Sequence, residues 1–120
     1  MGFREHLEKI CASVEGAVAA SVMGFDGIAI DTYESAGSDG VDLSSLLVEY
    51  ANILSQVRSA AGVLQSGGVR ELIISTDKLV TFSRPLGEEY FLILALVPDG
   101  NWGKARYVLR VAVPVVSREF

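Results

Sequence analysis

Eight apolar residues follow one another at positions 90–97, as Tyr-Phe-Leu-Ile-Leu-Ala-Leu-Val. A run of this kind cannot alternate between a buried and an exposed face. Its short length, between Gly87 and Pro98, favours a strand buried on both faces. Such a strand needs one layer of structure above it and another below it. The pattern therefore predicts a layered sandwich built around residues 90–97.

Three segments repeat their apolar residues at steps of three and four, which is the spacing of an amphipathic helix. They cover residues 3–14, 43–64 and 102–113. Pro114 follows the third segment and is expected to end or kink that helix, because proline lacks the N–H that the next turn requires. The second segment, about six turns long, also carries Val48 and Ile53 outside its main apolar stripe. It therefore has more apolar surface than one face of a sheet would cover.

Four further segments are rich in small or β-branched apolar residues and are predicted to be strands. They cover residues 17–23, 28–33, 69–76 and 79–84. Residues 24–27, Gly-Phe-Asp-Gly, separate the first two, and the Asp-Gly pair is typical of a tight hairpin turn. In chain order the elements are α-β-β-α-β-β-β-α. We therefore expect one domain over residues 1–120, an α/β fold in which a five-stranded, mostly antiparallel sheet forms the middle layer of a three-layer α-β-α sandwich.

Composition narrows the class of function. Of the 120 residues 50% are hydrophobic, the net charge is −5 and the pI is about 4.8. These values indicate a globular protein and argue against a nucleic-acid groove, where clustered basic residues are expected. No apolar run approaches the roughly 18 residues of a spanning helix, and the N-terminus lacks the apolar stretch of a signal peptide. Cys11 is the one cysteine, so no internal disulfide can form, and the expected location is the cytoplasm.

No pattern of residues predicts catalysis. A nucleophile and base would have to be Cys11 and His6, but five residues along a helix place the two side chains about 140° apart. Histidine, cysteine and carboxylates do not cluster at the spacing of a metal site. Residues 100–104, Gly-Asn-Trp-Gly-Lys, resemble part of a phosphate-binding loop but have too few residues between the glycines. We therefore expect no enzymatic activity, no cofactor and no metal.

The order of elements, together with several stretches of sequence, resembles the Roadblock (dynein light chain) domain. Residues 21–30 match the opening hairpin of the family, and residues 70–80 match the strand, turn and strand that precede the central strand. Within the family the sequence is most similar to the bacterial MglC type. Residues 25–28, 50–52 and 99–110 carry that similarity.

The resemblance implies a homodimer in which the strands at residues 69–76 pair edge to edge and the long helices pack together. An apolar edge strand with few charges, and the surplus apolar residues of the long helix, agree with this arrangement. The alternative is that the monomer covers these side chains itself. Six residues are expected in the dimer interface: Leu47, Val48, Ala51, Leu54, Leu72 and Ile74.

The resemblance also implies a non-catalytic adaptor. Proteins of the MglC type act through the Roadblock protein MglB and the polarity protein RomR, and so regulate the Ras-like GTPase MglA in bacterial cell polarity and gliding motility. The same interactions would recruit the protein from the cytoplasm to the cell poles. Direct activation of the GTPase would need an arginine finger on a protruding loop, and Arg84 is the nearest candidate.

A protein-binding role needs an exposed apolar anchor with polar neighbours. Phe25 at the tip of the predicted hairpin, with Asp26 and Ile28 beside it, fits that description. The alternative is that Phe25 folds back over the sheet edge as part of the core. Replacing Phe25 and Asp26 with alanine separates the two interpretations. Loss of binding without unfolding would indicate an anchor, and a large loss of melting temperature would indicate packing.

A different class of function is also open. The layered architecture is related to small-molecule sensor modules of the profilin, PAS and GAF type, which hold a ligand in a cavity lined by a few polar groups. The leucine, isoleucine and valine residues of the central strand and its helices fill the expected core, which favours the adaptor. A ligand-induced thermal shift would favour the sensor.

Overall fold

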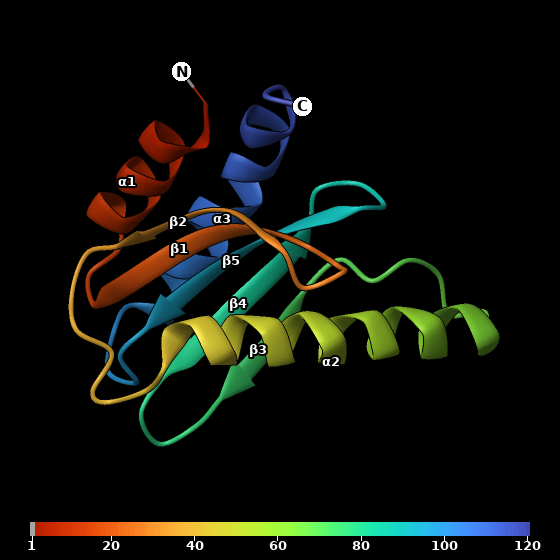
Figure 1. The fold of residues 1–120 in the computed structure, drawn as a ribbon, viewed down its shortest axis with the longest axis horizontal. Coiled ribbons are helices and arrows are strands. Elements are labelled where there is room, and N and C mark those ends of the chain that lie inside the picture. Colours follow the sequence, from red (N-terminus) through yellow and green to blue (C-terminus); the bar gives the residue numbers. More distant parts are fainter. Residues whose placement is uncertain (1) are drawn as a thin grey trace.

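The computed structural model describes residues 2–120, and this part of the chain forms three helices and five strands (Figure 1). The predicted order α-β-β-α-β-β-β-α is confirmed. In chain order the elements are α1 (Phe3–Ser13), β1 (Ala17–Gly24), β2 (Ala29–Glu34), α2 (Leu43–Val63), β3 (Leu72–Ser75), β4 (Val80–Pro85), β5 (Tyr90–Leu96) and α3 (Trp102–Ser117).

The strands form one antiparallel sheet in the order β2-β1-β5-β4-β3, so β5 is the central strand, as the sequence predicts. Every residue of β5 after Tyr90 is buried. Leu92 and Leu94 belong to one cluster of core side chains, whereas Phe91 and Ile93 belong to a second. Because successive side chains point to opposite faces of a strand, both faces of β5 are covered.

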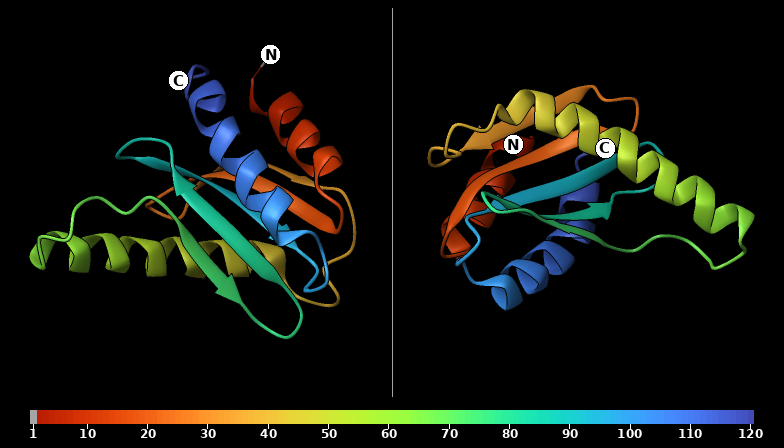
Figure 2. Two further views of the ribbon diagram at one scale, coloured as in Figure 1. Left: turned by 180° about the vertical axis from the view of Figure 1, so that it is seen from behind. Right: turned by 90° about the horizontal axis from the view of Figure 1, so that it is seen from below.

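The helices lie on both faces of this sheet (Figure 2). α1 and α3 pack side by side on one face, and α2 crosses the other. Leu47, Ala51 and Leu54 of α2 are buried against the sheet, and the helix then runs on past the sheet edge. Because the sheet does not reach under the last turns of α2, Val63 and Leu64 are 79% and 76% exposed.

Two of the predicted boundaries are wrong. α3 does not end at Pro114 but continues to Ser117. Val116, beyond the proline, is fully buried in the core, and we attribute the continuation to this burial, which offsets the hydrogen bond that proline cannot donate. The strand expected at residues 69–76 is limited to β3, and Val69 packs against the core from the preceding loop.

The turn between β1 and β2 holds the hairpin tip close to α2. Gly27 has φ +89°, in the left-handed region that favours glycine. The Gly24 N–H donates to the Ile28 carbonyl at 2.8 Å, and the Asp26 carboxylate accepts from the Ile28 N–H at 3.0 Å. A Cβ at Gly27 would lie 3.7 Å from a methyl group of Val48 in α2. The turn therefore fixes Asp26 and Ile28 beside α2.

Candidate protein-interaction site

His6 and Cys11, the residues considered for catalysis, have different surroundings. Cys11 is buried, and this burial raises the pKa of its thiol. The His6 Nε2 atom lies 2.8 Å from a carboxylate oxygen of Glu119. Among residues 2–120, no three side chains of the histidine, cysteine, aspartate or glutamate type gather to hold a metal ion. The same residues include no helix of the length and apolarity that crossing a membrane requires.

Phe25 folds back onto the core. Its ring centroid lies 5.2 Å from that of Phe91, which is fully buried in β5. The Arg58 guanidinium of α2 lies 3.8 Å from the centroid of the Phe25 ring. Phe25 is thus enclosed between the sheet and a cation from α2, and only part of its ring reaches solvent. This geometry agrees with the packing alternative for Phe25.

Three hydrogen bonds fix the same corner of the molecule. The Phe25 N–H donates to the Glu89 carbonyl at 3.0 Å, and the Ser55 hydroxyl donates to the Phe25 carbonyl at 3.2 Å. Arg58 also donates to the Glu88 carbonyl at 3.0 Å. These contacts join the hairpin tip, α2 and the turn before β5. The hairpin tip is therefore a rigid support for the side chains beside Phe25.

Ile28 and Asp26, which flank Gly27 in the turn, are exposed. Ile28 is 62% exposed, and Val48 of α2, next to the turn, is 49% exposed. Glu49 and Asn52 of α2 line a shallow hollow of about 260 Å³ with Asp26 and Val48. We call these five residues the hairpin surface. It combines two exposed apolar side chains with polar and acidic neighbours, which is the composition expected of a protein-binding site.

Three of the six residues expected in the dimer interface are buried within the monomer. Leu47, Ala51 and Leu54 are 5%, 0% and 1% exposed, because they form the face of α2 that packs on its own sheet. The monomer thus covers these three side chains, as in the alternative interpretation, and their part in a dimer interface stays a prediction. Val48 is exposed, but it faces the hairpin and belongs to the hairpin surface.

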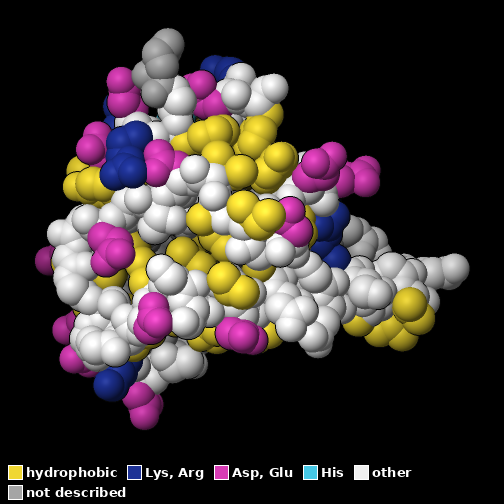
Figure 3. Space-filling view, in the orientation of Figure 1, with side chains coloured by type: hydrophobic (Ala, Val, Ile, Leu, Met, Phe, Trp, Pro, Cys, Tyr) yellow, Lys and Arg dark blue, Asp and Glu magenta, His cyan; other side chains and the backbone are white. Residues whose placement is uncertain are grey.

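A second apolar side of α2 faces the opposite direction. At 100° per residue, Tyr50, Ile53, Val57 and Leu64 lie on the flank of the helix away from Val48. Since Val48 faces the β2 side of the sheet, this α2 flank faces the β3 side. Ile53 is 40% exposed, and Figure 3 shows a separate apolar group at the projecting end of α2.

β3 ends the sheet next to this flank. Its partner on one side is β4, and its other edge has no strand beside it in the described part of the chain. Leu72 and Ile74 of β3 are half-buried on the α2 side, and Ile73 on the other side is 37% exposed. An open edge with apolar residues is suited to pairing with a strand of another chain.

Arg84 does not occupy a position that suits an arginine finger. It lies in β4 rather than on a protruding loop, and its guanidinium donates to the Glu71 carboxylate at 3.3 Å. The side chain of Arg84 is 19% exposed. Arg58, which encloses Phe25, was not among the predicted site residues, because nothing in the local sequence of α2 indicates a contact with the distant hairpin.

Comparison with known proteins gives the following relatives. A sequence profile of the Roadblock/LC7 domain matches residues 5–96. MglC from Myxococcus xanthus, known as a crystal structure, is 51% identical over 100% of both chains, with a TM-score of 0.73. No curated protein matches the sequence. The resemblance predicted from the element order and from residues 21–30 and 99–110 is therefore confirmed.

Two more distant structures share the fold. The gliding protein MglB from Thermus thermophilus has a TM-score of 0.84 at 19% identity, covering 97% of this chain and 86% of that chain. A Roadblock/LC7 domain from Streptomyces avermitilis has a TM-score of 0.83 at 15% identity, covering 98% of this chain and 97% of that chain. At these identities the likeness concerns the fold alone.

Proposed function

Because the chain belongs to the Roadblock/LC7 domain family, we propose that it is a non-catalytic adaptor that binds a second Roadblock protein of the MglB type. The observation that carries this proposal is the 51% identity to Myxococcus xanthus MglC over the whole of both chains. The hairpin surface supports it, because Ile28 and Val48 offer apolar contacts on a rigid corner of the fold. In this proposal Phe25 supports the site and Ile28 makes the contact.

We propose further that the adaptor is a homodimer formed by β3 and the α2 flank. The unpaired edge of β3 and the exposed Ile53 support this arrangement. A two-fold axis would place the same edge of each subunit against the other, which is the commonest form of association between identical chains. The two hairpin surfaces would remain open, since Val48 faces away from the α2 flank.

Through the MglB-type protein, the adaptor would regulate a Ras-like GTPase of the MglA type in bacterial cell polarity and gliding motility. The Thermus thermophilus structure that shares this fold is named gliding protein MglB, which links that protein to gliding. RomR is the further partner in this proposal. These interactions would move the protein from the cytoplasm to the cell poles.

Isothermal titration with the MglB-type Roadblock protein of the same organism tests the proposed function. We expect saturable binding by the wild-type protein. Ile28→Glu should weaken that binding at least about tenfold, because it places an unpaired charge within an apolar contact. Val63→Glu is the matched control, since Val63 is also exposed and apolar but lies at the far end of α2. Absence of binding by the wild type, or normal binding by Ile28→Glu, would contradict the proposal.

A further inference from the structure

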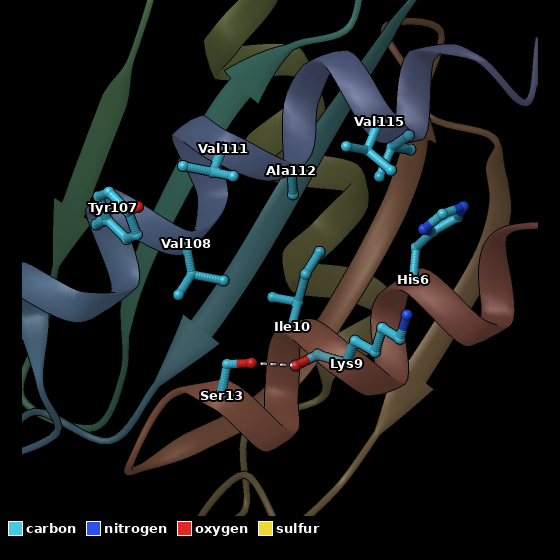
Figure 4. Close-up of a pocket in the computed structure, with 10 residues that line it drawn as sticks. His6, Lys9, Ile10, Ser13, Tyr107, Val108, Val111, Ala112 and Val115 are labelled. Carbon is cyan, nitrogen blue, oxygen red and sulfur yellow. Dashed lines mark hydrogen bonds between the residues drawn. The ribbon is translucent and has the colours of Figure 1, made fainter.

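A groove between α1 and α3 lies on the face of the sheet opposite α2 (Figure 2). It has a volume of about 300 Å³, and all the residues that line it belong to these two helices. Figure 4 shows Ile10 on α1 across from the residues that α3 contributes. Lys9 lines the groove from α1. The groove is thus separate from both the hairpin surface and the α2 flank.

α3 presents an apolar stripe along this groove. Tyr107, Val111 and Val115 lie four residues apart and are 55%, 47% and 37% exposed. The buried face of α3, which packs on the core, is formed by other residues, namely Ala105, Leu109 and Val116. A helix at the surface of a globular protein normally carries polar residues on its second face. The stripe therefore leaves apolar surface open to solvent in the monomer.

Positive charge surrounds one end of the stripe. Lys104, Arg106 and Arg110 are the charged residues of α3, which has no acidic residue between Trp102 and Ser117. Arg106 makes a bidentate pair with Glu71, with distances of 2.7 and 3.1 Å. The Arg110 guanidinium lies 5.5 Å from the centroid of the Tyr107 ring. Tyr107 lines both the apolar groove and the hollow of about 240 Å³ that these arginines surround.

Carboxylates offset this charge only in part. That hollow is lined by one carboxylate, that of Glu71, and by three guanidinium groups, those of Arg84, Arg106 and Arg110. At the other end of the groove the one histidine, His6, is already bonded to Glu119. On α1, a rotation of 100° per residue places Glu5 and Glu8 away from Ile10, on the outer side of the helix. A surface with excess positive charge at one end therefore exists on a chain whose net charge is −5.

We infer that this groove binds one amphipathic helix of a partner protein, with acidic residues at the end of that helix that lies beside Tyr107. Apolar side chains of the bound helix would pack on Val111 and Val115, in the manner of other helix-in-groove complexes. Its carboxylates would pair with Arg110, since Glu71 already binds Arg106. From Tyr107 to Val115 the stripe is about 12 Å long, so about two turns of the bound helix would cover it. Because the groove and the hairpin surface lie on different faces, both can be occupied at once.

The probe for this test is a synthetic helical peptide of sixteen residues with leucines on one face and three glutamates at one end. Its matched control has lysines in place of the three glutamates. Fluorescence anisotropy with the whole protein should show the acidic peptide binding at least about tenfold more tightly than the basic peptide, with the difference decreasing at high salt. Equal binding of the two peptides, or binding of neither, would overturn the inference.

Two variants locate the binding. Val111→Glu and Arg110→Glu alter exposed side chains, so both variants should fold. Each should lower the affinity for the acidic peptide at least about fivefold. Ile28→Glu should bind the peptide normally, which separates this inference from the proposed function. Unchanged affinity in both groove variants would overturn the inference. In the absence of peptide, a molar mass of Val111→Glu below that of the wild-type protein would also overturn the inference, because a second copy of the chain would then be the occupant of the groove.

Discussion

Phe25→Ala is expected to destabilise the protein by about 2–3 kcal/mol. Truncating a fully buried phenylalanine costs roughly 3–5 kcal/mol, and Phe25 is partly exposed, so its packing is expected to account for about 2 kcal/mol, below that range. The contact with Phe91 at 5.2 Å and the Arg58 guanidinium at 3.8 Å contribute up to about 1 kcal/mol more. For a chain of 120 residues this corresponds to a fall in melting temperature of about 8–12 °C.

Thermal and urea denaturation of Phe25→Ala and Ile28→Ala measure this difference. Ile28 is 62% exposed, so Ile28→Ala should change the free energy of unfolding by no more than about 0.5 kcal/mol. If Ile28 becomes buried on binding, the exposed part of its side chain is worth about 1–2 kcal/mol, or roughly a 5- to 30-fold loss of affinity for the MglB-type protein. A Phe25→Ala variant that melts within about 2 °C of wild type but no longer binds would refute this reasoning.

Three further outcomes are expected. Ile53→Glu should place a charge in the proposed α2 contact and lower the molar mass measured by light scattering to the monomer value of 12.8 kDa, whereas Val63→Glu should not. Glu71→Gln should lower the free energy of unfolding by about 1 kcal/mol at pH 7. The hydrogen bond and charge of Arg106 hold the pKa of Glu71 below its usual value. This stabilisation is therefore present above about pH 4.3 and is lost as the pH falls through the lowered pKa. Urea denaturation should show a smaller difference in the free energy of unfolding between wild type and Glu71→Gln at pH 3 than at pH 7. Cys11, whose thiol pKa burial raises, should react with a disulfide reagent at a measurable rate only after denaturation, and rapid labelling of the native protein would contradict this.

Much of the fold follows from the spacing of apolar residues. The run at residues 90–97 predicted a strand with two covered faces, and β5 occupies the centre of the sheet. The end of α3 could not be predicted in the same way. The effect of Pro114 depends on whether the residues after it are buried, and the burial of Val116 is a property of the packed core.

The candidate site was predicted less completely. The Asp-Gly turn located Ile28 at the hairpin, but the sequence could not tell whether Phe25 points outward or inward. That choice depends on Phe91 and Arg58, which are distant in the chain. The spacing of Leu47, Ala51 and Leu54 identified an apolar face of α2 without indicating whether its own sheet or a second subunit covers it.

This Roadblock domain is proposed to act by binding another Roadblock protein. Size-exclusion chromatography with light scattering, on the protein alone and mixed with the MglB-type protein of the same organism, tests it most directly. We expect a mass of about 26 kDa alone, twice the 12.8 kDa of one chain, and a single larger species after mixing that Ile28→Glu does not form. Two separate peaks at the masses of the unmixed proteins would contradict the claim.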